Sequence, residues 1–425
     1  MEYYFVGIKG SGMSALANIL VDLGYKVKGV DYEKKHYTDE ISKRVLVENF
    51  ENVKLDKNSF YIIGNAFKLH PLSKKIISER YNYDYYPSFI ESFFKMKKIG
   101  ISGSHGKTTT TSFLHQLLGE KANALIGDGT GYGYPHAENF LFEACEYQNT
   151  FLKYTFDYLV ILNIDYDHPD FFKTNNEYIF AFQKASLNAK TLIINNDCPH
   201  CRKIIHSNKI TFGTSKDSDV VFQLENDKIT IDFFGEIMTL DYKFYNKTLA
   251  YNLVAAVIVK YLIVDDISDV FTKVKELRFP KRRFEEVKLR NDLILVSDYA
   301  HHPTEIKVVI DTLRIKYPTF KLIVVYQGHT YTRTHTFLNE YTHVLNDADE
   351  VYVMPIFSSV REEDFDSDIL LKNDNGFRKY ERASLDSFLE EKSIIVAFLG
   401  AGDIDSEFIF LLKKVNYWKH LSYVV

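Results

Sequence analysis

The chain has 425 residues, of which 46% are hydrophobic, and its 52 Lys and Arg against 57 Asp and Glu give a net charge of −5. This length predicts two or three domains, and the composition excludes a disordered chain. The near-balance of charge argues against a dedicated nucleic-acid surface. We expect no membrane insertion and no signal peptide, because we find neither an apolar run long enough to cross a bilayer nor a basic stretch followed by an apolar one at the N-terminus.

The first segment, predicted as a domain over residues 1–95, has a Rossmann-like βαβ pattern. A strand leads into the glycine turn Gly7-Ile8-Lys9-Gly10-Ser11-Gly12, and Asp31 ends the next strand, where a ribose-binding carboxylate belongs. The glycine spacing departs from the dinucleotide fingerprint, so NAD and another nucleotide diphosphate fit these residues equally well. The predicted elements are strands at 3–6, 27–30 and 61–63 and a helix that ends at Gly24.

The second segment, predicted as a domain over residues 96–279, opens with a phosphate-type loop. The stretch Gly103-Ser104-His105-Gly106-Lys107-Thr108 joins a predicted strand to a helix, although Gly103 stands too close to Gly106 for a Walker A loop. Glycines let backbone N–H groups approach phosphate oxygens, and the helix N-terminus adds partial positive charge. Lys107 can bridge the phosphates of ATP, and the Thr108 hydroxyl can bind Mg²⁺. The alternative is a glycine-rich turn with a solvated lysine.

Two further strand ends carry oxygen ligands of the kind that Mg²⁺ prefers. Glu143 and Glu146 follow one strand, and the stretch NIDYDHPDF places Asp165, Asp167 and His168 after another. Because the carboxyl ends of parallel strands converge, these residues are candidates for the same site as the phosphate loop.

The rest of this segment predicts a mostly parallel, P-loop ATPase-like sheet with an antiparallel edge. Near-continuous apolar runs indicate parallel strands, and alternation from 220 to 240 indicates antiparallel ones. Cys198-Pro199-His200-Cys201 resembles half a zinc site, but the chain has no second pair, so we interpret it as the turn into a helix. The predicted strands are 98–102, 140–143, 158–164 and 192–195, with hairpin turns at 226–227 and 235 and helices at 109–118 and 251–263.

The third segment, predicted as a domain over residues 280–425, is again Rossmann-like, so the fold class is α/β with three domains in series. It opens with the basic cluster Lys281-Arg282-Arg283. Two strand ends carry polar stretches, SDYAHHPTE with Tyr299 and His301, and YQGHTYTRT with Arg333. An arginine there suits a carboxylate or a phosphate. The predicted strands are 293–297, 322–326, 351–354 and 394–398.

The order of these stretches resembles that in the Mur ligases of peptidoglycan synthesis over essentially the whole chain. The short phosphate loop matches that family's own loop, and the variants around Glu146 and Asp167, with IGDGTG upstream, resemble the form found in Firmicutes. The stretches that carry the resemblance are GIKGSGM, GSHGKTTTT, EACEY, NIDYDHPDFF, KRRF, DYAHHPTE, HTYTRT and GAGD.

The resemblance implies a cytoplasmic, ATP- and Mg²⁺-dependent ligase. Its three domains would hold UDP-N-acetylmuramate, hold ATP with magnesium, and close over both. ATP would phosphorylate the muramoyl carboxylate, and the amine of L-alanine would attack the acyl phosphate, releasing ADP and phosphate in a step of cell-wall biogenesis that serves cell shape and division. It implies small-molecule substrates, no nucleic-acid partner, no membrane insertion, and a monomer or a homodimer.

The resemblance also implies roles for individual residues. Those for ATP are Gly103, Ser104, Gly106, Lys107, Thr108, Thr109, Asn252 and Arg283. Those for the UDP-sugar and the reacting groups are Gly10, Ser11, Gly12, Met13, Asp31, Asn65, Tyr299, His301 and Arg333. Those for the metal are Thr108, Glu146 and His168, and those for catalysis are Lys107, Glu146, His168, His301 and Arg333.

Some positions depart from the family pattern. Only Asn252 remains of an adenine-side motif that often reads G-x-H-N-x-x-N, and Phe279-Pro280 replaces Gly-Val before the basic cluster. Alternatives are a ligase that recycles murein tripeptide, folylpolyglutamate synthase, and an inactive nucleotide-binding partner or regulator. Folylpolyglutamate synthase lacks a full nucleotide-sugar domain. The inactive partner or regulator is disfavoured because the chain keeps Lys107, Thr108, Glu146 and His168.

Overall fold

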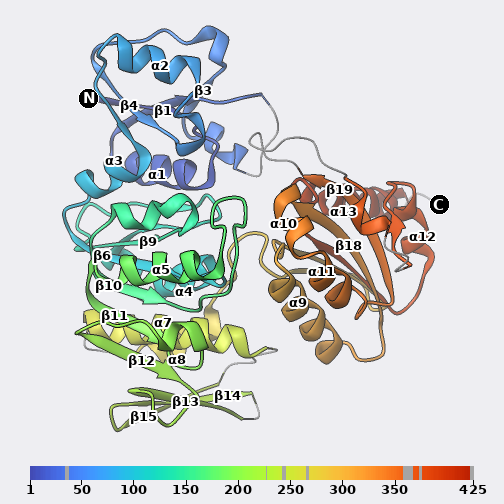
Figure 1. Cartoon of the computed structure of the whole chain (residues 1–425). Helices are drawn as coiled ribbons and strands as arrows, with labels where there is room; N and C mark the ends of the chain where they lie inside the picture. The colour runs from blue at the N-terminus through green and yellow to red at the C-terminus, as the bar shows by residue number, and fades with distance from the viewer. Residues whose placement is uncertain are drawn as a thin grey trace. The chain divides into compact units, whose positions relative to one another are not determined.

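The computed structural model describes residues 1–33, 38–225, 227–241, 246–264, 268–357, 367–372 and 376–421, with side chains described as far as residue 415. These residues form two compact units. The first comprises Met1–Tyr166 and Asn175–Arg278, and the second comprises Asp167–Thr174 and Phe279–Val425. Three sheets follow one another along the chain, each flanked by helices, which confirms the predicted α/β fold class (Figure 1).

The first sheet is parallel throughout and has the strand order β3-β2-β1-β4-β5. Its central strands are buried because their apolar side chains face helices or core on both sides. The carboxyl ends of β2, β1 and β4 lie side by side, which is where a Rossmann-like sheet binds its ligand. Its elements are β1 (Glu2–Val6), α1 (Ser11–Asp22), β2 (Lys26–Val30), β3 (Leu46–Glu48), β4 (Ser59–Ile63), α2 (Pro71–Ser78), β5 (Tyr83–Tyr85) and α3 (Tyr86–Phe93).

The second sheet, also in the first unit, has the order β15-β14-β13-β12-β11-β10-β6-β9-β7-β8. It is parallel from β13 to β7, and β13, β14 and β15 form the predicted antiparallel edge. The predicted turn residue Asn226 lies outside the described residues. Its strands are β6 (Lys97–Ser102), β7 (Ala122–Leu125), β8 (Gly131–Tyr132), β9 (Asn139–Glu143), β10 (Phe156–Ile161), β11 (Ala189–Asn195), β12 (Lys209–Gly213), β13 (Val220–Glu225), β14 (Lys228–Phe233) and β15 (Glu236–Asp241). Its helices are α4 (Lys107–Leu118), α5 (Asn175–Ser186), α6 (Pro199–Arg202), α7 (Lys247–Val264) and α8 (Val270–Glu276).

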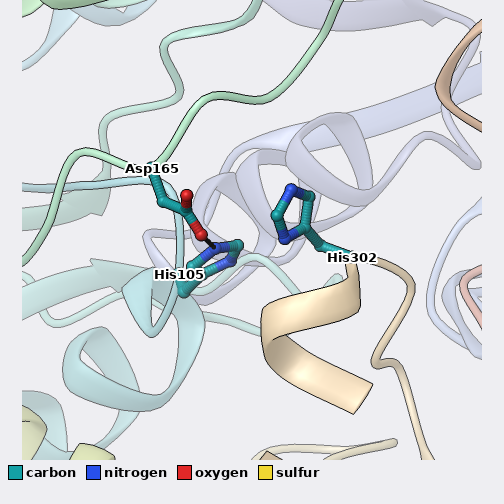
Figure 2. A group of neighbouring side chains, drawn as sticks. All are labelled: His105, Asp165 and His302. Carbon is teal, nitrogen blue, oxygen red and sulfur yellow. Dashed lines mark hydrogen bonds and ion pairs between the residues drawn. The ribbon is translucent and has the colours of Figure 1, made fainter. Parts of the chain in front are cut away.

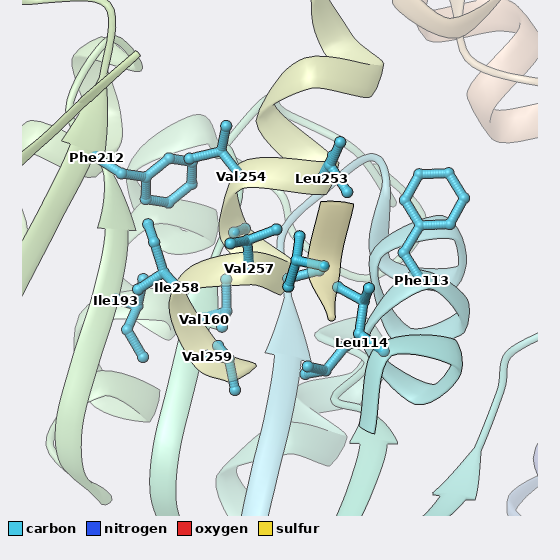
Figure 3. Packing of buried hydrophobic residues seen from close by; sticks show 14 of the residues in the cluster. Phe113, Leu114, Val160, Ile193, Phe212, Leu253, Val254, Val257, Ile258 and Val259 are labelled. Carbon is cyan, nitrogen blue, oxygen red and sulfur yellow. The ribbon is translucent and has the colours of Figure 1, made fainter. Parts of the chain in front are cut away.

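Helix α7 forms the centre of an extensive hydrophobic core. Figure 3 shows Leu253, Val254 and Val257 of this helix between the strands and helix α4, which contributes Phe113 and Leu114. The helix has 18 residues and is apolar enough to cross a membrane by length and composition. Our expectation that no stretch would meet that criterion was therefore wrong. Its burial among strands and helix α4 is the physical reason for its uniform apolarity, because a helix that packs on all sides has no polar face.

Helix α1 packs closely on the short strand β8. A Cβ atom added to Gly131 would lie 1.9 Å from the carbonyl oxygen of Ala15, a separation that no side chain can adopt without backbone movement. Glycine at this position therefore allows the first sheet's helix to approach the second sheet within the same unit.

The third sheet, in the second unit, has the order β16-β17-β21-β18-β19-β20. Strand β16 is antiparallel to β17, and the other pairs are parallel. Its strands are β16 (Glu285–Arg290), β17 (Leu293–Asp298), β18 (Lys321–His329), β19 (Glu350–Phe357), β20 (Arg378–Lys379) and β21 (Ile394–Leu399). Its helices are α9 (Pro303–Lys316), α10 (Tyr331–Thr336), α11 (Leu338–Leu345), α12 (Ser384–Glu390) and α13 (Asp405–Leu421).

The predicted strands and helices all occur, with shifted boundaries. Strand β10 ends at Ile161 and not at residue 164, and helix α7 begins at Lys247 and not at residue 251. Strand β18 continues three residues beyond the prediction, to His329, through a register shift between Gln327 and His329.

Candidate active site

The phosphate-type loop connects β6 to α4, as predicted. Gly103 and Gly106 have φ angles of +134° and +84°, which L side chains rarely adopt. A Cβ on Gly106 would lie 2.5 Å from the side-chain oxygen of Asn252, so the predicted adenine-side residue lies against this loop. Both the backbone conformation and the close approach therefore require glycine at position 106.

The segment after β10 holds the loop in place. The Asn163 side chain accepts from the His105 N–H at 2.8 Å and donates to its carbonyl at 3.0 Å. The Ser104 hydroxyl donates to the Asp165 carbonyl at 2.7 Å, and the His105 ring lies 2.9 Å from the Asp165 carboxylate (Figure 2). These contacts fix the loop with its glycines and Lys107 at the carboxyl edge of the sheet.

Lys107 forms a buried ion pair with Glu146. The ammonium lies 2.9 Å from Oε2 of Glu146, which is fully buried, and it also donates to the Ser104 carbonyl at 3.1 Å. Burial disfavours the lysine charge, but the Glu146 carboxylate outweighs it and raises the pKa of Lys107 above its ordinary value. The lysine is therefore held charged beside the loop, as a group that binds phosphate must be.

The Thr108 hydroxyl contacts Glu143 at the same sheet edge. It donates to Oε2 of Glu143 at 2.7 Å, and a Cβ on Gly127 would lie 2.0 Å from that oxygen. A hydroxyl and a carboxylate at this spacing are hard oxygen donors of the kind that suit Mg²⁺. The residues present therefore fit a magnesium ion, with Glu143 beside Thr108 and Glu146 beside Lys107.

The first sheet presents the predicted UDP-sugar residues at the ends of its central strands. Gly10 precedes α1, which begins with Ser11, Gly12 and Met13. Both carboxylate oxygens of Asp31 accept backbone N–H groups, from Lys9 at 2.7 Å and from Tyr32 at 2.8 Å, so Asp31 also holds the glycine turn. Burial raises the pKa of Asp31.

Asn65 follows strand β4 at this same edge of the first sheet. Its side-chain oxygen is buried and makes no hydrogen bond among the described residues. Such an orphaned acceptor is costly unless a donor reaches it. This observation fits a bound ligand with N–H or O–H groups.

In the second unit, Arg333 and Asp167 form a buried ion pair. The Arg333 Nε donates to Asp167 at 2.8 Å, and one terminal nitrogen lies 3.4 Å from the His168 ring. Burial alone would raise the pKa of Asp167, but the Arg333 guanidinium holds it well below its ordinary value. His168 has a φ of +57° and Thr330 a φ of +71°, conformations that are strained for such residues and that cluster at functional sites.

The predicted residues after β17 gather around helix α9. The His301 ring lies 3.0 Å from the carbonyl of Tyr299, and Arg283 stacks on the Tyr299 ring at 5.1 Å. Arg283 also lies 3.7 Å from Glu305. Burial lowers the pKa of His301 to about 4, and burial raises the pKa of Asp298 to about 6. His301 is therefore neutral at pH 7.

The residues predicted for ATP, the metal, the reacting groups and catalysis are distributed over both units. Lys107, Thr108, Thr109, Glu146 and Asn252 lie in the first unit, and His168, Arg283, Tyr299, His301 and Arg333 lie in the second. The first unit brings the loop together with Lys107 and Glu146. The second unit brings His168 together with Arg333.

Sequence reasoning missed several contacts of the loop. Tyr178 of α5 lies 2.9 Å from the Ser104 hydroxyl and donates to Glu146 at 3.3 Å, and no motif pointed to it. Asn163 stood in the stretch NIDYDHPDF, where an amide directly after a strand could have marked it as a loop partner. Glu143 was considered as an oxygen ligand, but the metal set predicted for Thr108 omitted it.

Known protein families match the chain along most of its length. Sequence models of the Mur ligase family catalytic domain, the Mur ligase middle domain and the glutamate ligase domain match residues 2–98, 101–260 and 282–383. The chain belongs to the Mur ligase family. Among solved structures, this ligase is similar to UDP-N-acetylmuramate-alanine ligase MurC from Thermotoga maritima, with a TM-score of 0.80 at 20% identity, covering 98% of this chain and 99% of that one.

Other members of the family have similar folds. A murein peptide ligase from Psychrobacter arcticus has a TM-score of 0.71 at 17% identity, covering 98% of each chain. The MurF ligase from Thermotoga maritima in complex with ADP has a TM-score of 0.62 at 18% identity, covering 92% of this chain and 95% of that one. At such low sequence identities, this similarity shows that the chain shares the fold of these ligases.

Proposed function

We propose that this Mur ligase joins L-alanine to the carboxylate of UDP-N-acetylmuramate at the expense of ATP, in the cytoplasm. The observation that carries the proposal is the buried Lys107–Glu146 pair beside the glycine loop, with the Thr108–Glu143 contact at the same strand ends. Such a site suits a nucleoside triphosphate. The first sheet, with Asp31 and the buried Asn65 oxygen, provides a second nucleotide-type edge that suits UDP.

The proposed reaction has two steps. A carboxylate is a poor electrophile, so its oxygen first attacks the γ-phosphorus of ATP and ADP leaves. The amine of L-alanine then attacks the acyl phosphate, loses a proton, and the tetrahedral intermediate collapses to the amide and phosphate. Phosphoryl transfer depends on positioning and charge neutralisation.

The residues of the chain have corresponding roles in this proposal. Lys107 neutralises phosphate charge, and the loop N–H groups orient the phosphates. Thr108, Glu143, Glu146 and His168 would hold magnesium, which supplies further charge neutralisation when bound. Asn252 and Arg283 would contact ATP, and Tyr299, His301 and Arg333 would contact the reacting groups. His301 would present a neutral ring to the reacting groups.

The likeness to a murein peptide ligase favours one alternative, the attachment of a tripeptide to the same carboxylate. Purified protein with UDP-N-acetylmuramate and ATP should release phosphate with L-alanine and more slowly with glycine, L-serine or a tripeptide. Each amino acid without UDP-N-acetylmuramate serves as the control for uncoupled ATP hydrolysis. Turnover with the tripeptide and none with L-alanine would replace the proposed substrate with the peptide.

A further inference from the structure

Cys198 and Cys201 form a pair of thiols that the proposed ligation does not use. Cys198 precedes helix α6 and Cys201 lies in its first turn, after strand β11. Cys201 is fully buried and Cys198 is half-buried, and the two residues stand on either side of Pro199 and His200 at the start of α6. Cysteines separated by two residues at the start of a helical turn lie within the Cα distance of about 5–6 Å that a disulfide spans most often.

The two thiols differ in acidity. The side-chain hydrogen bond from Cys201, followed by N–H groups of Cys201, Ile164 and His200, lowers the pKa of Cys198 to about 6 against the opposing effect of burial. Burial raises the pKa of Cys201 well above its ordinary value. In a C-x-x-C arrangement, a more accessible thiolate that attacks and a buried thiol that resolves are the two parts of thiol–disulfide exchange.

We propose that Cys198 and Cys201 are a reversible dithiol–disulfide site that reacts with low-molecular-weight disulfides. The Cys198 thiolate attacks one sulfur of the disulfide, a mixed disulfide forms, and the first small thiol leaves. Cys201 then loses its proton and attacks Cys198 Sγ, which releases the second small thiol. The two cysteines are oxidised and the small disulfide is reduced to two thiols, so the electrons and protons balance.

The site is connected to the phosphate loop through the segment after β10. The N–H of Ile164 donates to Cys198 Sγ at 3.4 Å, and the next residue, Asp165, contacts Ser104 and His105. Because a disulfide sulfur carries no charge and accepts a hydrogen bond more weakly than a thiolate, this hydrogen bond weakens on oxidation. We therefore expect faster amide exchange at Ile164 in the oxidised protein, a change that does not depend on which substrates the enzyme uses.

The test is incubation of the full-length protein at pH 7 with oxidised glutathione, followed by peptide mass spectrometry. The wild type should lose two thiols and yield a peptide with a Cys198–Cys201 disulfide, whereas Cys201→Ala should keep glutathione on Cys198. Cys198→Ser should react at least ~10²-fold more slowly at this segment, because the attacking thiolate is gone. Near-ultraviolet circular dichroism checks that each variant is folded.

Cys145 provides the matched control within the same chain. Cys145 has no second cysteine near it in the sequence that could act as a resolving thiol, so it should form no internal disulfide and should react less than Cys198. Preferential modification of Cys145, a wild type that retains glutathione without forming the internal disulfide, or no loss of thiols at all would each overturn the proposal.

Discussion

Replacing Lys107 with alanine is expected to reduce turnover by ~10²–10³-fold or more, because one preorganised positive charge is removed from the transferring phosphoryl group. In the structure this ammonium lies beside the glycine loop and is held there by Glu146 at 2.9 Å. Steady-state phosphate release with both substrates present measures the effect. The exposed Lys153 in the same unit is a suitable control, and Lys153→Ala should leave turnover unchanged.

The Lys107 variant also needs a control for folding, because it leaves the fully buried Glu146 carboxylate without its cation. A buried charge that loses its partner destabilises a protein by several kcal/mol or becomes protonated. The double variant Lys107→Ala/Glu146→Gln removes that charge, so its melting temperature should recover while its turnover stays low. Turnover of Lys107→Ala within about threefold of the wild type would show that the loop does not act on phosphate.

Replacing Arg333 with alanine is expected to destabilise the second unit by about 3–5 kcal/mol, because Asp167 remains buried without its guanidinium partner. Arg333 and Asp167 are each 4% exposed, and they are joined by hydrogen bonds of 2.8 and 3.4 Å. Chemical denaturation followed by circular dichroism measures the free energy of unfolding. The loss of unfolding free energy should be smaller in the double variant with Asp167→Asn, because that replacement removes the unpaired buried carboxylate.

Arg314 is the matched control for this experiment. It forms an ion pair of 2.8 Å with Asp349 in the same unit, but both side chains are about a third or more exposed. Exposed pairs contribute about 0–1 kcal/mol, so Arg314→Ala should have a small effect on unfolding. Equal effects of the Arg333 and Arg314 replacements would contradict the account of a buried pair.

The sequence was most informative where backbone geometry restricts the residue type. Gly103 and Gly106 correctly marked a tight loop between β6 and α4, because both adopt positive φ angles. The apolar runs predicted the central strands of all three sheets, since a parallel strand that is buried on both faces is apolar at nearly every position. The glycine turn before α1 and Asp31 after β2 were placed correctly, because each directly follows a strand that its apolar run predicted.

Contacts between distant segments could not be predicted in this way. Glu143 and Glu146 follow one strand three residues apart, and only the fold shows that Glu143 faces Thr108 while Glu146 faces Lys107. Strand β10 ends early because the chain after Leu162 turns toward the loop and the Ile164 N–H bonds to Cys198. Tyr178 reaches Ser104 from a helix whose sequence has no motif. Each of these depends on tertiary packing.

The measurement that tests the central claim most directly uses UDP-N-acetylmuramate with ¹⁸O in its muramoyl carboxylate. If this ligase activates that carboxylate as an acyl phosphate, one labelled oxygen should appear in the inorganic phosphate for each amide formed with L-alanine. Formation of the amide with unlabelled phosphate, or phosphate release that does not require UDP-N-acetylmuramate, would contradict the account.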